Sequence, residues 1–430
     1  MVKKLTKNLT FWVAVAAVLG YASARLFGDP AWTSAAAPPA IYGLILLIKT
    51  VFLALLKMLV APIIFFSLIG GLLSIGDVTR LKTLGSVTIL YYICTTAIAI
   101  CIGLTIVLFV HPWVGTVEQI SIQAMTQSPG YVAPAQFIDQ GSGSLLRVFQ
   151  QLLSTAFTNP FSALAELNIL GIATNAFIIG LALLLAVPPD SPLVISIEHI
   201  NRVLHKVLAW VVLTTPVGLF AVLFDVTLRS GDTLLNSLLG FSAIVIAGTL
   251  LHGLVVLPLI AKIFTGVGPI SFFGKAGKPL MVAFATSSSL ATLPVSMQTA
   301  EDEFGVSQTV SSFVFPLGAT MNMDGTALYE GIAAVFLAYL FGIDLGTVGM
   351  ITVFFMAMVS SIGAPGMPSG SMAGMQMVLL SVGIPLEAIG ILLVVERPLD
   401  TLRTAVNVEG DMIGALVTQA RLDANGRKSL

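Results

Sequence analysis

Long apolar segments recur along the whole chain and constrain its fold more than any other feature. Hydrophobic residues make up 57% of the 430 residues and charged residues only 10%, against about 25% charged in an average soluble domain. A membrane helix needs about 20 apolar residues, so this length predicts an integral membrane protein with roughly eight spans. The apolar segments lie at 10–27, 41–75, 83–110, 148–186, 194–228, 236–264, 309–341 and 386–420.

Basic residues at both ends of the chain indicate its orientation in the membrane. Lys3, Lys4 and Lys7 precede the first apolar segment, and no cleavage site of a signal peptide follows closely. The tail at 421–430 is basic as well. Because Lys and Arg concentrate on the cytoplasmic side, we expect both termini in the cytoplasm and an even number of crossings. The net charge of −1 argues against a nucleic-acid partner.

Two apolar segments, 268–300 and 345–384, are broken in the middle by small and polar residues. Backbone that is left unpaired at such breaks cannot face lipid and must be buried in protein or line a wet cavity. We therefore expect two re-entrant helical hairpins, which enter from opposite sides as inverted repeats if both termini are cytoplasmic. Each is followed by a long apolar helix with a polar interruption, a pattern typical of the binding site of secondary transporters.

The most charged stretch of the chain is ERPLDTLRTAVNVEGD at 396–411. At about 100° per residue, its polar side chains form one stripe of a helix. A charge at mid-membrane costs at least about 2.5–3.5 kcal/mol, so such a stripe faces an interior and marks an ion or substrate path. Asp400 and Arg403, at i and i+3, could simply pair with each other, but this leaves the rest unexplained. The stripe consists of Glu396, Asp400, Arg403, Thr404, Asn407 and Asp411.

The side chains of this stripe indicate that the substrate is a zwitterion with an extra carboxylate. Arg403 offers a planar fork for bidentate binding of a carboxylate, and Asp400 can bind an ammonium group. Asn407 and Asp411, together with backbone carbonyls, suit a hard cation such as Na⁺. The first interrupted helix supplies matching groups in the sequence NMDGT at 322–326, where the glycine favours local unwinding.

Four motifs together resemble one known family, the dicarboxylate/amino acid:cation symporters, which include the glutamate and aspartate transporters. The resemblance covers essentially the whole chain. It implies eight transmembrane helices and two hairpins per protomer, with an elevator-type transport domain on a homotrimeric scaffold in the cell membrane. The motifs are TSSSLATLP at 286–294, GATMNMDGTALYEG at 318–331, SIGAPGMPSG at 361–370 and DTLRTAVNVEGD at 400–411.

The resemblance also implies a division of the chain into scaffold and transport domain. It places scaffold helices 1 and 2 in residues 1–81, and transport-domain helix 3 in residues 82–111. The Pro-, Gly- and Ser-rich segment 112–147 is the expected extracellular loop, and scaffold helices 4 and 5 follow in residues 148–230. The core of the transport domain, with helix 6, both hairpins and helices 7 and 8, occupies residues 231–430.

By resemblance, particular residues take part in binding substrate and ions. The substrate contacts are Ser287, Ser288, Thr326, Gly366, Met367, Pro368, Asp400, Arg403, Thr404 and Asn407. One sodium ion is implied at Gly318, Asn322, Asn407 and Asp411, and a second at Tyr92, Thr95, Thr96, Asn322 and Asp324. Carbonyls of Thr320 and of the segment that includes Ser361, Ile362 and Ala364 would hold a third. No organic cofactor is expected.

Arg403 and Asp400 decide the expected substrate. Neutral amino acid members of the family lack an arginine at this position, so Arg403 favours L-aspartate or L-glutamate. Dicarboxylate members differ in this helix, so Asp400 favours amino acids over succinate or malate. The family usually has a further arginine, but this chain has Thr286 and Thr401 at the two positions concerned. Arg397 lies nearby without corresponding to either.

Glu330 is the candidate proton carrier. Sodium-only archaeal members carry a glutamine here, whereas members that also move a proton carry glutamate. Burial disfavours the charged form of a carboxyl group, which suits reversible protonation near neutral pH. The alternative is an acid that stays protonated and keeps one hydrogen bond.

The leading interpretation is therefore a symporter, not an enzyme, that takes up acidic amino acids with Na⁺ and H⁺. One alternative is a purely proton-coupled symporter of glutamate, aspartate or dicarboxylates. An alternative of another class is an ion channel, which needs no zwitterion-matched pair of charges. An intramembrane hydrolase lacks support, because no motif links a histidine to the hairpin serines. No nucleotide-binding loop suggests a primary pump.

Overall fold

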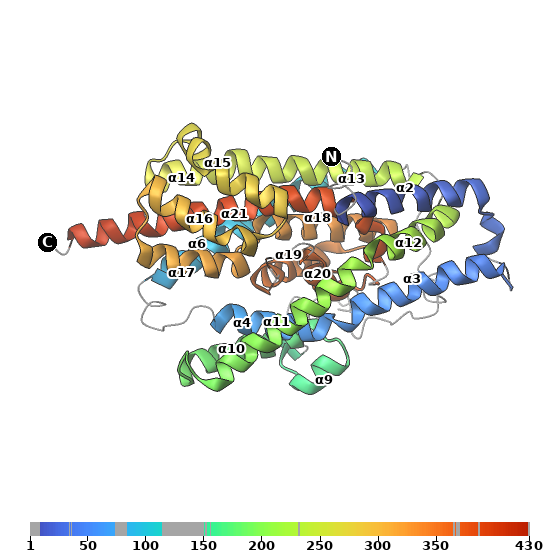
Figure 1. Cartoon of the computed structure of the whole chain (residues 1–430), viewed down its shortest axis with the longest axis horizontal. Coiled ribbons are helices and arrows are strands. Elements are labelled where there is room, and N and C mark those ends of the chain that lie inside the picture. The colour runs from blue at the N-terminus through green and yellow to red at the C-terminus, as the bar shows by residue number, and fades with distance from the viewer. Residues whose placement is uncertain are drawn as a thin grey trace.

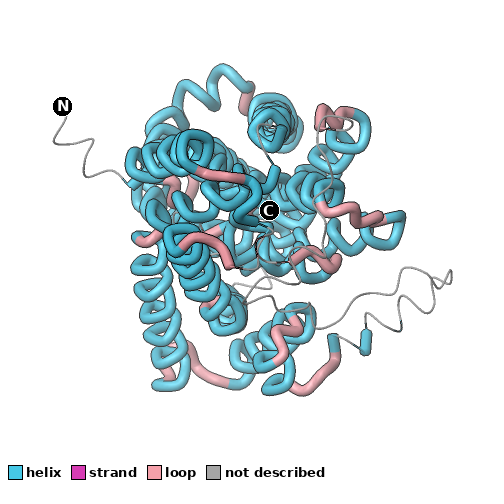
Figure 2. Tube along the Cα trace, turned by 90° about the vertical axis from the view of Figure 1, so that its right-hand side faces the viewer, coloured by secondary structure: helices cyan, strands magenta, loops and turns pink. Residues whose placement is uncertain are grey.

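The computed structural model is helical throughout the residues that it describes, and Figure 2 shows helices joined by loops with no strand among them. Most of the 112–147 loop lies outside the described residues, as do Lys3, Lys4, Lys7, Ala364, Met367 and Pro368. The described ranges are 9–33, 35, 37–73, 84–113, 150, 153–154, 156–230, 233–363, 366, 370–385 and 388–428.

Several helices are long and apolar enough to cross a membrane, as the sequence predicted. Within the described ranges three such spans occur, at Ala40–Leu73, Ser86–Phe109 and Asn236–Thr265. The helices Pro192–Leu213 and Thr215–Arg229 are together long and apolar enough for a further span, and they are bent by 52° near Pro216, which lacks a backbone donor. The all-helical membrane class is confirmed, and the number of eight spans stays a prediction. These spans are built from α3 (Ala40–Met58), α4 (Val60–Leu73), α6 (Ser86–Phe109), α11 (Pro192–Leu213), α12 (Thr215–Ser230), α13 (Thr233–Leu251), the π-helical η3 (His252–Val256) and α14 (Leu257–Thr265).

The N-terminal half forms two groups of helices. In one, α2 (Leu9–Phe27) and α3 pack against α12, and the short η1 (Pro30–Thr33) joins them. In the other, α10 (Ile169–Ala186) and α11 pack against α4, and the short α9 (Pro160–Ala165) packs against α10 (Figure 1).

A buried carboxylate ties α3 to α12 in the first group. Asp225 on α12 accepts hydrogen bonds from Lys49 Nζ at 2.6 Å and from Tyr42 Oη at 2.5 Å, both on α3. Arg229 Nε, one turn further along α12, donates to the same carboxylate at 2.9 Å. Removing one partner of a buried ion pair typically costs about 3–5 kcal/mol. This cluster therefore fixes how the two helices sit against each other.

The two interrupted segments form pairs of packed helices, with breaks where the sequence placed them. In the first pair, α15 (Pro269–Thr286) ends at Ser287, whose φ of 51° is left-handed, and α16 (Ser289–Phe304) begins after Ser288. The Ser288 hydroxyl caps α16 by accepting from Ala291 N at 3.1 Å. The second pair consists of α19 (Gly346–Gly363) and α20 (Ser371–Ser381).

The helices that follow the two pairs meet in the middle of the molecule. After the first pair, α17 (Gln308–Met321) and α18 (Asp324–Leu340) are separated by a break at residues 322–323. After the second, α21 (Ile389–Lys428) is one continuous helix of 40 residues. It packs against α13 to α18 and reaches from the centre to the C-terminal end (Figure 1). The broken helix and the charged helix therefore lie in contact.

Candidate functional site

The polar stripe of α21 is buried, as its spacing predicted. Arg403 is 0% exposed, and no other member of the stripe exceeds 5%. Leu402 and Ala405, on other faces of the same helix, are only partly buried. The stripe therefore faces protein, which lowers the free-energy cost of placing charged side chains inside a membrane.

Arg403 lies among two carboxylates, a hydroxyl group and an aromatic ring. Its Nη2 is 2.6 Å from Glu396 Oε1 and 3.1 Å from Asp400 Oδ1. The same nitrogen donates to Ser371 Oγ on α20 at 3.1 Å. The guanidinium carbon lies 3.8 Å from the centroid of the Tyr329 ring. The predicted pair of Asp400 with Arg403 does form, but it is one contact of a larger cluster.

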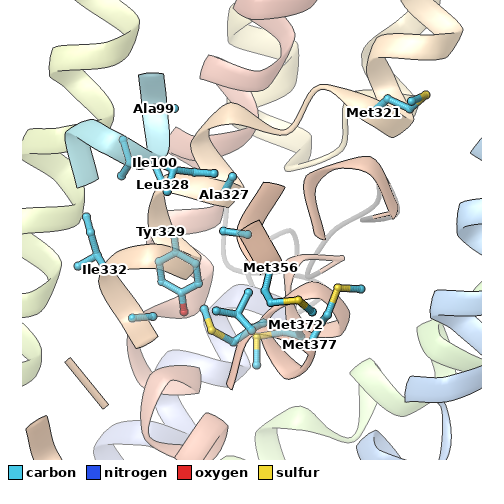
Figure 3. Close-up of a cluster of buried hydrophobic side chains, with 14 of the residues drawn as sticks. Ala99, Ile100, Met321, Ala327, Leu328, Tyr329, Ile332, Met356, Met372 and Met377 are labelled. Atoms are coloured by element: carbon cyan, nitrogen blue, oxygen red, sulfur yellow. The ribbon is translucent and has the colours of Figure 1, made fainter. Parts of the chain in front are cut away.

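Apolar side chains surround the ring on which Arg403 stacks. Figure 3 shows Tyr329 of α18 in a buried cluster with Leu328, Ile332, Met356 and Met372. Such surroundings have a low effective dielectric constant, which strengthens interactions between charges and makes an unpaired charge costly. In this cluster one guanidinium faces two carboxylates, so the three charges interact strongly.

The break between α17 and α18 supplies a second polar group directly beside the stripe. Asn322 Nδ2 donates to Asp411 Oδ1 at 2.9 Å, and the Gly325 amide donates to Asn407 Oδ1 at 2.8 Å. A Cβ at Gly325 would lie 2.7 Å from the Arg403 carbonyl oxygen, so only glycine permits this approach. The structure thereby brings together four of the residues that were predicted for substrate and sodium binding.

The helix α6 adds hydroxyl groups to the same region. Thr96 Oγ1 donates to Asp324 Oδ1 at 2.7 Å, and Thr95 Oγ1 lies 3.4 Å from that oxygen. Tyr92 Oη donates to the carbonyl of Val314 at 2.9 Å. Thr95 also bonds to carbonyls of its own helix, which is the plain packing role of such a threonine. The contacts to Asp324 nevertheless join α6 to the broken helix.

Gly318 lies in close contact with the Asp411 carboxylate and leaves no room for a side chain. A Cβ at this position would overlap with the Asp411 carboxylate and would lie 2.6 Å from Tyr92 Oη. The resemblance implies a sodium ion at Asp411, so we expect Gly318→Ala to displace this carboxylate and to raise the sodium concentration for half-maximal uptake by about tenfold or more. A sodium titration of uptake measures this effect. The matched control is Gly331→Ala in α18, where a Cβ makes only ordinary contacts of 3.4 Å or more.

The tips of the two helix pairs touch each other. Ser288 Oγ donates to the Gly366 carbonyl at 2.8 Å, and the Leu290 amide donates to the same oxygen at 3.0 Å. Gly366 also lies against the Ala319 carbonyl of α17. The described residues give the side chains of Ser287 and Thr404 no hydrogen bond to the rest of the predicted set.

The residues predicted for a third sodium ion lie beside α4. A Cβ at Gly71 would lie 3.6 Å from the Ile362 carbonyl oxygen and 3.8 Å from Thr320 Oγ1. This places Thr320 and Ile362, from α17 and α19, on one side of α4. Ser361 is buried and its hydroxyl donates to the Met358 carbonyl of its own helix at 2.8 Å.

Glu330 is fully buried between α18 and the second helix pair. Its Oε1 accepts from Ser360 Oγ on α19 at 2.9 Å. Gly374 on α20 packs directly against this contact. Its Oε2 has no hydrogen-bond partner among the described residues. Within the part of the chain that the structure describes, the carboxyl group thus has one hydrogen bond, on one of its two oxygens.

Several residues of this region were not predicted from the sequence. His252 in η3 is fully buried and its Nε2 lies 3.0 Å from Asp324 Oδ2. Glu396 was placed on the stripe without a role, and Ser371 and Tyr329 were not considered as its neighbours. No spacing in the sequence indicates these contacts, because His252 and Asp324 are 72 residues apart. The weak signal for His252 was a titratable side chain inside an apolar segment.

This combination of membrane-length helices, two broken helix pairs and buried opposite charges defines a secondary transporter. The chain belongs to the Sodium:dicarboxylate symporter family, whose pattern matches residues 9–421. It is therefore a multi-pass membrane protein of a sodium-coupled transporter family and not an enzyme.

The relatives of the chain carry different substrates. Over 392 residues it is 33% identical to a neutral amino acid transporter B(0) of Oryctolagus cuniculus, which covers 86% of this chain and 72% of the relative. It is 33% identical over 401 residues to the Homo sapiens protein of that name, covering 88% and 73%. Over 410 residues it is 31% identical to an excitatory amino acid transporter of Caenorhabditis elegans, covering 87% and 81%. Overall similarity thus leaves the substrate open.

Proposed function

We propose that this protein takes up acidic amino acids, L-aspartate or L-glutamate, together with Na⁺ and a proton. The observation that carries the proposal is the fully buried guanidinium of Arg403 beside the Asp400 carboxylate. Asp400 can hold the ammonium group of an amino acid, and Arg403 can hold its side-chain carboxylate. A neutral amino acid has no side-chain carboxylate for Arg403 to bind.

The names of the relatives leave two substrate classes, and the charges of the site favour one of them. The similarity to neutral and to excitatory amino acid transporters is nearly equal. Arg403 Nε and Nη1 have no hydrogen-bond partner among the described residues, although both are buried. Buried donors without partners carry a large desolvation cost, which a bound carboxylate offsets. Buried donors in a binding site discriminate strongly between substrates, because a substrate that lacks the matching acceptor leaves them unpaired.

Sodium is the proposed driving ion and moves as cargo. The region around the break between α17 and α18 offers carboxylate, amide, hydroxyl and carbonyl oxygens, which are the ligands of hard cations. Asp411 with Asn322 and Asn407 would serve one ion, and Asp324 with Tyr92, Thr95 and Thr96 a second. Thr320 with the carbonyls at Ser361, Ile362 and Ala364 would serve a third.

The proposed architecture follows the family resemblance. It has eight spans and two re-entrant hairpins, with residues 1–81 and 148–230 as scaffold and residues 82–111 and 231–430 as the moving transport domain. The scaffold would form a homotrimer in the cell membrane, with both termini in the cytoplasm. The contact between Ser288 and Gly366 supports a gating role for both hairpin tips, because each tip closes on the other.

Glu330 is the proposed proton carrier, and its replacement should uncouple uptake from pH. Its buried carboxyl has a single hydroxyl neighbour, Ser360. We expect Glu330→Gln to retain sodium-driven uptake but to lose stimulation by an inward proton gradient, because the amide cannot release a proton. Aspartate uptake at a fixed sodium gradient, with and without a pH gradient, measures this. An unchanged pH dependence would exclude the role, and the control is Glu166→Gln, at an exposed position directly after α9.

The test of the proposed function is uptake of radiolabelled L-aspartate, L-glutamate, L-serine and succinate into proteoliposomes. An imposed sodium gradient and an imposed proton gradient without sodium are applied separately. Sodium-dependent uptake of the two acidic amino acids alone supports the proposal. Uptake driven by protons alone would mean that Glu330, and not the sodium sites, couples transport to the ion gradient. Uptake of L-serine without uptake of L-aspartate overturns the substrate assignment. Substrate flux that is not coupled to ions in a fixed ratio favours a channel.

A further inference from the structure

The nitrogen Nη2 of Arg403 has more acceptors than hydrogens. It carries two N–H groups, yet three oxygens lie within hydrogen-bond distance of it. Glu396 Oε1 is nearest at 2.6 Å, and Asp400 Oδ1 and Ser371 Oγ follow at 3.1 Å each. Ser371 also donates to Glu396 Oε1 at 2.7 Å, which fixes this carboxylate against the arginine.

The shape of a guanidinium group makes this nitrogen decisive for binding a carboxylate. A guanidinium has two edges with parallel N–H groups, one formed by Nε with Nη2 and the other by Nη1 with Nη2. The third edge is blocked by Cδ. Both usable edges include Nη2, so a carboxylate that binds Arg403 in bidentate fashion must take one of the N–H groups that Glu396 and its neighbours use.

We propose that Glu396 competes with the side-chain carboxylate of an acidic substrate for Arg403 and thereby sets affinity and selectivity. The inference rests on the proposed function. Asp400 is needed for the substrate ammonium, so Glu396 is the surplus negative charge once a second carboxylate arrives. A neutral amino acid brings no such carboxylate and does not have to displace Glu396.

The surroundings of Glu396 allow it to leave Arg403. Its Oε2 has no hydrogen-bond partner among the described residues. Glu396 lines a small cavity between α2, α3, α11, α12, α20 and α21, and the adjacent Arg397 lines the same cavity. Arg397 therefore offers a second cation to a carboxylate that has been displaced from Arg403. The remaining walls are mostly apolar, with Phe52, Leu208 and Met372 among them.

The test is the affinity of purified Glu396→Gln for L-aspartate and L-serine, measured by isothermal titration calorimetry in saturating NaCl. Gln keeps the size of the side chain and removes its charge. We expect the Kd of L-aspartate to fall by at least about fivefold, because the competing carboxylate is gone. The affinity for L-serine should not rise. The matched control is Glu409→Gln, the same substitution at another buried acidic side chain of α21; the described residues give it no ion pair with Arg403.

Each outcome decides between competition and a supporting role of Glu396. If Glu396 merely holds Arg403 in place, Glu396→Gln leaves the Kd of L-aspartate unchanged or raises it, and this overturns the inference. An equal gain in Glu409→Gln also overturns it, since that result indicates a long-range charge effect. If Glu396→Gln does not fold, Ser371→Ala replaces it, with a smaller gain expected and an absent gain contradicting the inference. A wild-type protein that binds no acidic amino acid contradicts the proposed function itself.

Discussion

Arg403→Cys should abolish the uptake of acidic amino acids while leaving a site for small neutral ones. Truncating one partner of a buried, hydrogen-bonded charge pair costs about 2–5 kcal/mol, so the affinity for L-aspartate should fall by about 100-fold or more. The variant also leaves the carboxylates of Glu396 and Asp400 without their cation, and these repel an anionic substrate. Competition of unlabelled amino acids against labelled L-aspartate and L-serine in proteoliposomes measures both effects.

A surface arginine provides the control for this experiment. Arg202 on α11 is largely exposed and only pairs with Glu198 at 3.7 Å. Arg202→Cys introduces the same thiol and should leave both substrates unaffected. Undiminished L-aspartate uptake in Arg403→Cys excludes Arg403 from substrate binding. Binding of L-serine that appears as L-aspartate uptake is lost shows that the variant is folded.

Asp411→Asn should lower the apparent affinity for sodium more than it lowers the affinity for the substrate. The amide keeps an oxygen ligand but removes the charge that offsets a cation, and two charges at 4 Å interact by about 4 kcal/mol at an effective dielectric constant near 20. We expect the sodium concentration for half-maximal uptake to rise by at least about tenfold. Sodium titrations at saturating L-aspartate measure this directly.

Asp423 on the same helix is the matched control for Asp411. It is exposed and its carboxylate accepts from Gln419 Nε2 at 2.8 Å. Asp423→Asn should leave the sodium titration unchanged. If Asp411→Asn behaves like this control, the ion assignment that joins Asp411 to Asn322 and Asn407 is wrong.

The helical stripe of α21 was predictable because it depends only on local geometry. Helical spacing decides which side chains share a face, and the cost of charge in lipid decides that this face is turned inward. The breaks at 285–294 and 322–326 were predictable for a similar reason, since Ser, Gly and Asn favour turns and caps over continuous helix. The structure has helix ends at both places.

The partners across the helices were not predictable from local geometry. The contacts of Glu396 with Ser371 and of His252 with Asp324 join residues from different helices. Asp225 was likewise not singled out, although Tyr42 and Lys49 reach it from a helix more than 170 residues away. Such contacts depend on how helices cross, and many crossing geometries are compatible with one pattern of apolar residues.

The sequence by itself determined that this chain is a helical membrane protein with two interrupted segments and one charged helix, because hydropathy and helical spacing are local properties. It also indicated that Arg403 and Asp400 lie in an interior. Only the tertiary structure decided that Arg403 shares its Nη2 with Glu396 and Ser371 and stacks on Tyr329. The reason is physical: three side chains from α20 and α21 meet at one nitrogen of Arg403, the Tyr329 ring of α18 stacks on its guanidinium, and only the packing of those helices sets these distances.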